Sequence, residues 1–207
     1  MSLSRKFFAI REAIPSEVNL LAVSKGYPSG YIKTLVDLGQ LNFGESRIQE
    51  ALPKIEKLKN ISAINWHFIG RLQSNKVRKV VRSFQFIHSL DSLDLAERVS
   101  RIAGEEHLTP KVFVQVKLRD DSAKGGFSPN TLRDQWIHLS NLNNLCFIGL
   151  MAISPIGLSL EERSLLFKEC RSLADELNLP ECSMGMSSDW LQALEAGATW
   201  LRIGSGL

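Results

Sequence analysis

The sequence predicts an α/β protein, a single (β/α)8 barrel that spans residues 1–207, and three observations lead to that prediction. The chain has 207 residues, which is about the lower limit for such a barrel and would leave two full-sized domains cramped. Eight short apolar runs occur along it. Amphipathic segments separate these runs, and this alternation is typical of a parallel sheet with right-handed crossovers. An open doubly wound sheet is the alternative.

The eight predicted strands are short and mostly rich in Val, Ile or Phe, which favour strand over helix. They cover residues 18–25, 42–45, 63–70, 86–90, 110–117, 145–153, 181–186 and 200–206. The runs 42–45 and 181–186 are weak on their own. We assign them because they fit the alternation of the others.

Seven helices are predicted between these strands, because apolar residues recur there at helical spacing, as at Leu166, Cys170 and Leu173. They cover 30–38, 47–59, 75–82, the segment after the candidate caps Asp91 and Ser92, the segment after Ser128, 166–177 and 189–196. Pro53 should kink or restart the second of them. A further helix over 2–13 is expected to cover part of the barrel wall. We expect no helix after the last strand, because the sequence ends at Leu207, and so predict a barrel that lacks its final helix.

The composition excludes several classes of protein. With 44% hydrophobic and 23% charged residues, the chain is neither disordered, collagen-like nor a coiled coil. No apolar run approaches the ~20 residues that cross a bilayer, so we expect no membrane association. The 25 Lys and Arg against 22 Asp and Glu give +3, too little to indicate nucleic acid. Three widely spaced cysteines argue against a disulfide framework and favour a reducing cytoplasm.

Functional residues of such barrels lie at the C-terminal ends of the strands. Lys25 follows an almost wholly apolar strand, so its ammonium group should lie at the barrel mouth. In partly dry surroundings a lysine can form a Schiff base with an aldehyde. The alternative is a lysine that extends from the strand end into solvent.

Small residues follow the last two strands, where barrels recurrently bind phosphate. Ser187 and Ser188 come after the seventh strand and open a helix, while Gly204 and Ser205 follow the eighth. Backbone N–H groups and a helix N-terminus can bind an anion there. Ordinary serine capping and a glycine-rich tail are the alternative. With Lys25 on the first strand, this arrangement predicts a phosphorylated aldehyde as the ligand.

Other polar residues carry weaker signals. A basic cluster around the third helix comprises Arg71, Lys76, Arg78, Lys79 and Arg82. It is either a solvated helix face, which we favour, or a polyanion site. His67 and His88 lie in strands without a paired carboxylate pattern, so packed, hydrogen-bonded histidines are favoured over a metal site. Glu45 is either a general base or a strand-end carboxylate paired with a lysine.

Seven motifs recur in order from about residue 20 to the end of the chain. They are LLAVSKGYP around Lys25, NFGES at 42–46, WHFIGRLQSNKVR at 66–78, HSLDS at 88–92, GLMAI at 149–153, SMGMSSDW at 183–190 and RIGSG at 202–206. Together they resemble the pyridoxal 5′-phosphate (PLP) homeostasis protein family, the YggS-like proteins, also called proline synthetase co-transcribed homologues.

The resemblance implies a fold-type III PLP barrel of the alanine racemase N-terminal type, with PLP as the cofactor. Lys25 matches the lysine that forms the Schiff base, and Arg202 matches the arginine that faces the pyridine nitrogen. The phosphate-loop positions match Ser187, Gly204 and Ser205. Other strand ends contribute Ser188, Met151 and Ser46 to the predicted site. The family usually has Asn where this chain has Ser46, and it usually continues with an FG-containing segment where this chain stops.

The resemblance also implies a role in PLP storage, delivery and balance and in amino-acid homeostasis, without established turnover. The expected partners are PLP and PLP-dependent apo-enzymes, in a cytoplasmic, monomeric protein. One alternative is a fold-type III enzyme, related to racemases or decarboxylases, with an unidentified substrate. Alanine racemase-like enzymes add a second β domain and a catalytic tyrosine from the dimer partner, and neither Tyr27 nor Tyr31 matches that position. The other alternative is an RNA-contacting protein that uses the basic helix, although the small net charge makes nucleic acid a poor candidate.

Overall fold

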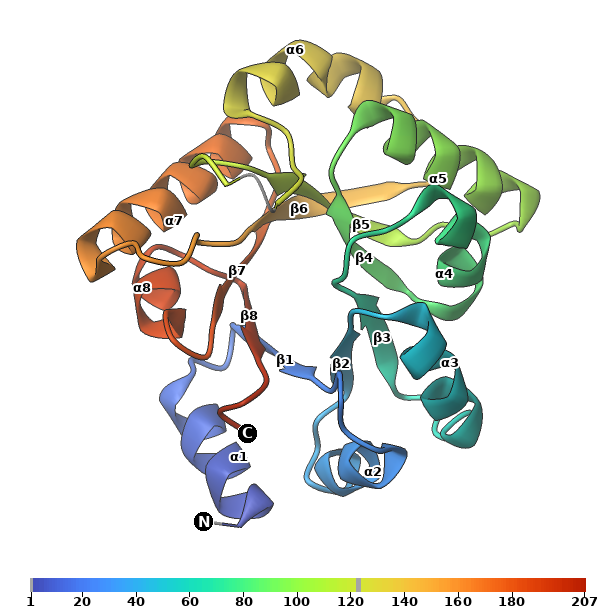
Figure 1. Cartoon of the computed structure of the whole chain (residues 1–207), viewed down its shortest axis with the longest axis vertical. Coiled ribbons are helices and arrows are strands. Elements are labelled where there is room, and N and C mark those ends of the chain that lie inside the picture. Colours follow the sequence, from blue (N-terminus) through green and yellow to red (C-terminus); the bar gives the residue numbers. More distant parts are fainter. Residues whose placement is uncertain (1, 122–123) are drawn as a thin grey trace.

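Eight parallel strands close into a barrel in the computed structural model, which describes residues 2–121 and 124–207 (Figure 1). Each strand pairs with the next in the chain, and β8 pairs with β1. The strands are β1 Asn19–Val23, β2 Asn42–Glu45, β3 Asn65–Phe68, β4 Phe86–Leu90, β5 Lys111–Val116, β6 Cys146–Ala152, β7 Glu181–Met186 and β8 Trp200–Ile203. The predicted barrel is confirmed, and the open sheet is wrong because β1 and β8 leave no free edge.

Helices cover the outside of the barrel in the described part of the chain. They are α1 Leu3–Ala13, α2 Ser29–Asp37, α3 Ile48–Lys57, the 3-10 helix η1 Ser74–Lys76, α4 Val77–Ser83, α5 Leu93–Glu105, α6 Pro129–Ser140, α7 Leu160–Glu176 and α8 Trp190–Glu195. The helix α3 continues through Pro53, so the restart predicted there does not occur. None of the helices described is both long and apolar enough to span a membrane.

Side-chain caps fix where several helices begin. The hydroxyl of Ser92 accepts a hydrogen bond from Leu95 N at the start of α5, and Ser128 does the same for Thr131 N at α6. Each cap satisfies one of the N–H groups that a first helical turn leaves without a partner. The predicted starts of these two helices are therefore confirmed.

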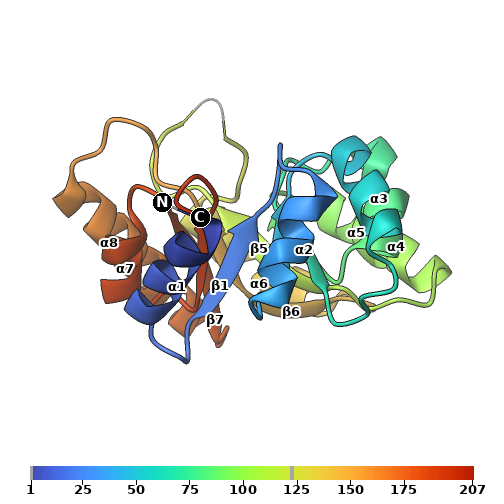
Figure 2. The same ribbon diagram turned by 90° about the horizontal axis from the view of Figure 1, so that it is seen from below.

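The helix α1 takes a place in the outer ring between α2 and α8, and the chain end lies beside it (Figures 1 and 2). Phe7 of α1 is buried in the main hydrophobic core. A Cβ on Gly206 would lie 3.5 Å from Ile10 Cδ1, so the segment after β8 packs against this helix. The expected N-terminal helix therefore covers the wall near β8 and β1, as predicted.

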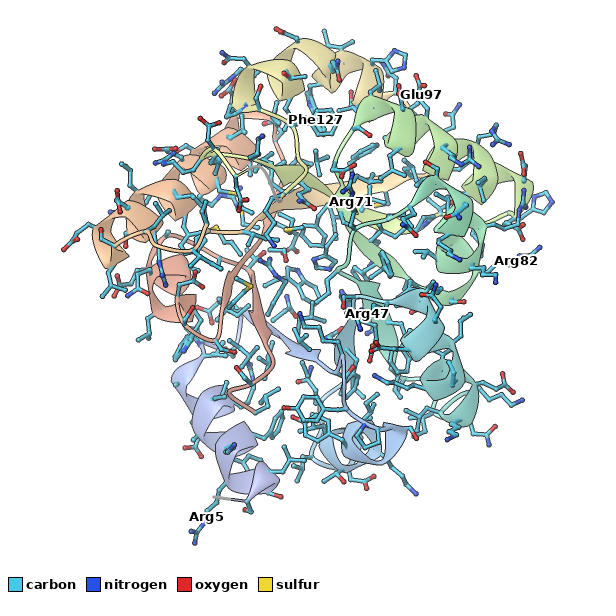
Figure 3. All side chains as sticks on the ribbon, in the orientation of Figure 1. Arg5, Arg47, Arg71, Arg82, Glu97 and Phe127 are labelled. Atoms are coloured by element: carbon cyan, nitrogen blue, oxygen red, sulfur yellow. The ribbon has the colours of Figure 1, made fainter. Side chains whose placement is uncertain are left out.

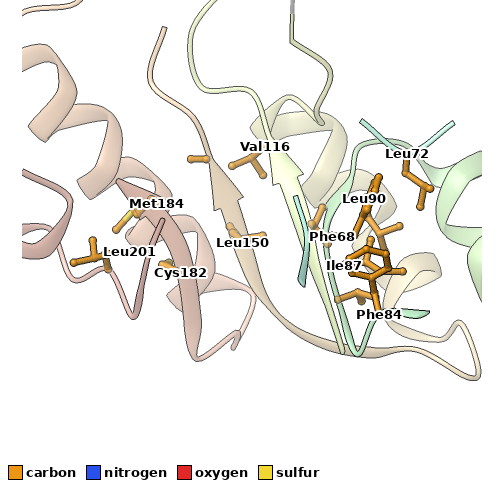
Figure 4. Packing of buried hydrophobic residues seen from close by; sticks show 14 of the residues in the cluster. Phe68, Leu72, Phe84, Ile87, Leu90, Val116, Leu150, Cys182, Met184 and Leu201 are labelled. Carbon is orange, nitrogen blue, oxygen red and sulfur yellow. The ribbon is translucent and has the colours of Figure 1, made fainter. Parts of the chain in front are cut away.

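The strands bury apolar side chains on both of their faces. The larger core lies between the strands and the surrounding helices, where residues such as Ile87, Leu150 and Leu201 pack (Figure 4). A second, smaller cluster fills the inside of the barrel and consists of Leu21, Phe86, Phe113, Met151 and Trp200. The inside of the barrel is thus a packed core rather than a pore. A ligand would therefore bind at the mouth of the barrel.

Gly70, which follows β3, lies against the backbone of Ser46. A Cβ at Gly70 would lie 2.0 Å from Ser46 O, whereas one at Gly30 in α2 would meet nothing within 4 Å. We expect Gly70→Ala to lower the free energy of unfolding by about 3 kcal/mol, because backbone has to move to admit the methyl group. The matched control Gly30→Ala should be neutral or slightly stabilising. Urea denaturation checks both, and equal midpoints for the two variants would contradict the expectation.

Candidate functional site

Lys25 lies just beyond the C-terminal end of β1. Its side chain is exposed and makes no hydrogen bond or ion pair with the residues that the structure describes. The partly dry surroundings expected for it are therefore not observed, because the residue is exposed. The register pairs Ala22 with Ile203, so the ends of β1 and β8 are neighbours at the barrel mouth.

A buried ionic cluster holds the backbone that precedes Lys25. Glu45, at the end of β2, is fully buried and accepts hydrogen bonds from Ser24 Oγ at 2.6 Å and from Lys54 Nζ at 2.7 Å. The Lys54 ammonium also donates to Ser24 O at 2.8 Å. Of the two interpretations of Glu45, the structure supports the carboxylate paired with a lysine. Sequence reasoning missed Lys54, because only the packing of α3 brings it to β1.

The loops after β7 and β8 meet, as predicted. Gly204 N donates to Ser187 Oγ at 3.4 Å, and Ser187, Ser188 and Ser205 are all exposed. A Cβ on Gly204 would lie 3.3 Å from Val23 Cβ, so this glycine lets the loop lie close against the end of β1. The arrangement places hydroxyl and backbone N–H donors at the same edge of the barrel as Lys25.

The helix that follows β7 begins later than expected. It starts at Trp190 rather than near Ser188, and it has only six residues. Its N-cap is Asp189, which is buried and accepts hydrogen bonds from Met186 N at 2.7 Å and Ser154 Oγ at 2.7 Å. The start of the helix therefore follows Ser187 and Ser188 closely, and its contribution to anion binding stays a prediction.

Arg202 lies inside the barrel near its mouth. Its guanidinium donates to Ser183 Oγ and to Ala152 O, both at 2.8 Å, and the residue is buried. Burial lowers the pKa of Arg202 to about 10, while the nearby Asp189 carboxylate acts in the opposite direction. A pKa of about 10 leaves the group charged at neutral pH. The site therefore contains a cation whose orientation is fixed by two acceptors.

The two other predicted site residues lie in different surroundings. Met151 is almost fully buried in the cluster inside the barrel, beneath the mouth, whereas Ser46 is half-buried in the turn after β2. The backbone of Ser46 is tied to the β3 loop by its close approach to Gly70. Contact of either residue with a ligand stays a prediction.

His67 and His88 are packed and hydrogen-bonded, as predicted. Their rings are joined by a 3.0 Å contact between His67 Nδ1 and His88 Nε2, and both residues are fully buried. Burial lowers the pKa of His67 to about 3, with a smaller effect from the Lys111 charge. Burial also lowers the pKa of His88 well below its usual value, and the positive charges of His67 and Arg202 act in the same direction. Both rings are therefore neutral at physiological pH.

The lowered pKa of His67 makes stability depend on pH. The unfolded chain takes up a proton near pH 6.5, while the folded protein does so only near pH 3. We therefore expect His67 to reduce the free energy of unfolding by about 2 kcal/mol as the pH falls from 6.5 to 5. Denaturant unfolding at both pH values checks this. His67→Gln should remove this contribution to the change in the free energy of unfolding, whereas His107→Asn, at an exposed histidine, should keep it. An identical pH dependence of the two variants would contradict the expectation.

The basic cluster does not form one cationic surface. Arg78 is bonded to Glu105 and Glu106, and Arg82 donates to Glu106 at 2.6 Å. Arg71 lies toward the barrel axis, whereas Arg82 lies at the outer edge of the ring (Figure 3). These observations support the solvated helix face and not the polyanion site.

A cavity of about 950 Å³ lies away from Lys25, between residues 71–74 and the start of α5. Its charged lining is balanced and consists of Arg71, Arg98, Arg101, Asp91, Asp94 and Glu97. It lies beside the ends of β3 and β4, and its lining includes neither Lys25 nor Ser187, Gly204 or Arg202. We therefore place the candidate site at the ends of β1, β7 and β8.

The residues at these three strand ends fit a phosphorylated aldehyde. An unpaired amine on Lys25 can react with the aldehyde, and the hydroxyl and N–H donors around Ser187 and Gly204 suit a phosphate. The oriented cation of Arg202 can donate to a bare ring nitrogen. Among the described residues no group of His, Cys, Asp and Glu side chains could hold a metal ion.

Comparisons with known proteins agree with this geometry. The profile of the family described as alanine racemase, N-terminal domain, matches residues 2–207. A pyridoxal phosphate homeostasis protein of Synechocystis is 47% identical over 198 residues, which cover 93% of this chain and 91% of the relative. A protein of the same name from Aquifex aeolicus is 38% identical over 192 residues, 90% of this chain and 84% of the relative.

Solved structures give the same result. PipY of Synechococcus elongatus, a COG0325 family member whose structure has PLP bound, is 44% identical with a TM-score of 0.96, over 100% of this chain and 99% of PipY. Alanine racemase of Clostridium difficile has a TM-score of 0.78 at 13% identity, over 98% of this chain and 55% of the racemase. The similarity to the racemase concerns the fold alone.

Proposed function

The chain belongs to the pyridoxal phosphate homeostasis protein family, within the wider family of alanine racemase N-terminal domains, and from this premise we propose that it binds PLP and acts in PLP homeostasis. The observation that carries the proposal is the meeting of three strand ends at the barrel mouth. They bring together the free amine of Lys25, the donors around Ser187 and Gly204, and the fixed cation of Arg202. The PLP-bound structure of PipY, at 44% identity, supports it.

Each of these groups has its own task in the proposal. Lys25 is the amine that would bond to the PLP aldehyde, and its exposure would let water hydrolyse that bond and release the amine and the aldehyde. Ser187 and the backbone N–H groups around Ser188, Gly204 and Ser205 hold the phosphate. When bound, PLP supplies an aldehyde that reacts reversibly with amines and a ring that withdraws electrons.

Arg202 faces the pyridine nitrogen in this proposal. A guanidinium has donors only and remains charged, so it donates to a bare nitrogen and disfavours an added proton. A ring whose nitrogen is unprotonated withdraws electrons less strongly. The site is therefore suited to holding PLP rather than to stabilising a substrate carbanion, and we propose storage and delivery without turnover.

Further proposals follow from the make-up of the site. Residues 1–207 act as one PLP-binding domain, because α1 shares the core of the barrel. All groups named above come from one chain, so a monomer is sufficient to bind PLP. Exposure of Lys25 would let PLP-dependent apo-enzymes accept the cofactor directly. The three free cysteines, of which Cys170 and Cys182 are buried, suit the reducing cytoplasm.

An absorbance titration tests the proposal. Purified protein mixed with one equivalent of PLP should develop a visible band that stays with the protein through gel filtration. A protein that remains colourless after this treatment would remove the proposed function. Prolonged incubation with L-amino acids, followed by chiral chromatography, should show no conversion. Lys25-dependent conversion at ~1 s⁻¹ or faster would favour a fold-type III enzyme of the racemase or decarboxylase kind instead.

A further inference from the structure

A chain of polar side chains crosses the inside of the barrel and begins at Arg202. It connects Arg202 Nη1 with Ser183 Oγ at 2.8 Å, Ser183 Oγ with His88 Nδ1 at 2.9 Å, His88 Nε2 with His67 Nδ1 at 3.0 Å, and His67 Nε2 with Asn42 Oδ1 at 3.2 Å. Apart from Asn42, which is half-buried, every member is buried. The chain therefore leads from the mouth to the start of β2, at the opposite end of the barrel.

The far end of the chain fixes the tautomer of both histidines. Asn42 Oδ1 is an amide oxygen that also accepts from Asn65 Nδ2 at 3.1 Å, and an oxygen of this kind cannot donate. His67 Nε2 must therefore carry the proton, which leaves His67 Nδ1 as an acceptor in the neutral ring. His88 Nε2 then has to donate to it, and His88 Nδ1 is left as an acceptor.

The near end of the chain is compatible with the same direction. Arg202 offers donors only, so Ser183 Oγ accepts from Nη1. The hydroxyl proton of Ser183 is then free to be donated to His88 Nδ1, the atom that the far end leaves as an acceptor. The Asn42 end therefore sets the direction of the chain, and the hydroxyl of Ser183 accommodates it at the Arg202 end.

We propose that His67 and His88 are positioning residues for Arg202, both in the Nε2–H tautomer, and that their one-directional chain from Arg202 to Asn42 holds the guanidinium toward bound PLP. This inference rests on the proposed function and adds residues that act through Arg202 without touching the ligand. Successive donors polarise one another, so the neutral chain disperses the buried charge. An imidazolium cannot accept a hydrogen bond, and protonation of either ring would break the line.

Aromatic rings surround the histidines of the chain. His67 stacks on Phe86 with 4.0 Å between the ring centroids, and the Trp200 ring lies 4.9 Å from that of His67. His88 stacks on Phe113 at 4.2 Å. In such apolar surroundings a polar atom without a partner is costly, so removal of one member leaves its neighbour to reorient. If the hydroxyl group of Ser183 is removed, the neighbour that loses its fixed orientation is the guanidinium of Arg202.

The tautomers are tested on the protein without PLP. Nitrogen-15 NMR of histidine-labelled protein at pH 7 should show His67 and His88 as neutral rings, protonated at Nε2 and bare at Nδ1. An Nδ1–H tautomer or an imidazolium at either residue overturns the inference. Because no PLP is present, this result stands apart from the success or failure of the proposed function.

The positioning role is tested by His88→Phe against a matched control, Phe113→Leu, which alters packing next to His88 but keeps every polar atom of the chain. In His88→Phe we expect the separate NMR signals of the Arg202 Nη protons to merge, and the Kd for PLP to rise about 10-fold. The control should keep the signals and the Kd of the unchanged protein. Equal effects of the two variants on both measurements would reduce His88 to a packing residue and overturn the inference.

A second variant covers the case in which His88→Phe does not fold. Ser183→Ala removes only the hydroxyl group between Arg202 and His88, and it should give the same loss of Arg202 order and the same weakening of PLP binding. Unchanged Arg202 signals in a folded Ser183→Ala protein would contradict the positioning role. If the unchanged protein binds no PLP at all, the proposed function fails, while the NMR signals of Arg202 still decide the inference.

Discussion

Lys25→Ala is expected to lose all covalently retained PLP. Lys25 is exposed at the end of β1, makes no bond to a described residue, and lies at the edge where the loops after β7 and β8 meet. Only a free, neutral amine can attack the aldehyde, and no other lysine combines this freedom with this position in our proposal. Borohydride treatment followed by peptide mass spectrometry should place the pyridoxyl group on Lys25 in the unchanged protein and on no residue in the variant.

Lys33→Ala provides the matched control, because Lys33 is an exposed lysine on the neighbouring helix α2. This variant should retain the full amount of reducible PLP. The assignment of Lys25 would be refuted by a pyridoxyl group on another lysine, together with normal PLP binding in Lys25→Ala.

The ionic cluster behind Lys25 explains why an exposed lysine can still have a fixed position. Lys54 bonds both to Glu45 and to the carbonyl of Ser24, the residue directly before Lys25. A buried, paired carboxylate of this kind is costly to leave alone, so the cluster resists rearrangement. The amine of Lys25 is therefore exposed, while the hydrogen bond from Lys54 holds the backbone directly before it.

Sequence reasoning found those parts of the fold that depend on short-range pattern. Runs of Val, Ile and Phe located strands such as β4 and β5, and serine caps located the starts of α5 and α6. The same reasoning placed Lys25, Ser187 and Gly204 at strand ends, because a barrel puts all such ends on one side. The predicted strand 200–206 was too long, since regular pairing ends at Ile203 before the glycine-rich turn.

Contacts between distant residues could not be read from the pattern. His88 and Ser183 are 95 positions apart in the chain, and only closure of the barrel brings them within 2.9 Å. Asp189 was likewise predicted as the first residue of a helix, but its hydrogen bonds to Met186 N and Ser154 Oγ, which the pattern did not indicate, place it as the N-cap of α8. Polar side chains inside a barrel are found only when the register of its strands is known.

Pyridoxal, which lacks the phosphate, is expected to bind at least about 100-fold more weakly than PLP, because two charge-assisted hydrogen bonds are worth about 3 kcal/mol. Ser187 Oγ and the N–H groups around Gly204 are the donors that we assign to the phosphate. In our proposal these loop donors provide most of that energy, because α8 has only six residues. A reversible bond to Lys25 alone would let the ligand exchange quickly. The hydrogen bonds to the phosphate should therefore dominate the affinity for PLP.

Ser187→Glu tests the same loop from the protein side. The carboxylate would occupy the place of the anion, and its charge would repel the phosphate, so we expect the Kd for PLP to rise by a similar factor of about 100. Ser16→Glu, at an exposed serine before β1 on the opposite side of the barrel, adds the same charge without entering the site and should leave the Kd unchanged. Fluorescence titration with PLP and pyridoxal gives all the constants. Pyridoxal that binds as tightly as PLP, or a Ser187→Glu protein that binds PLP normally, would show that the phosphate lies elsewhere, because neither result is compatible with an anion held between the ends of β7 and β8.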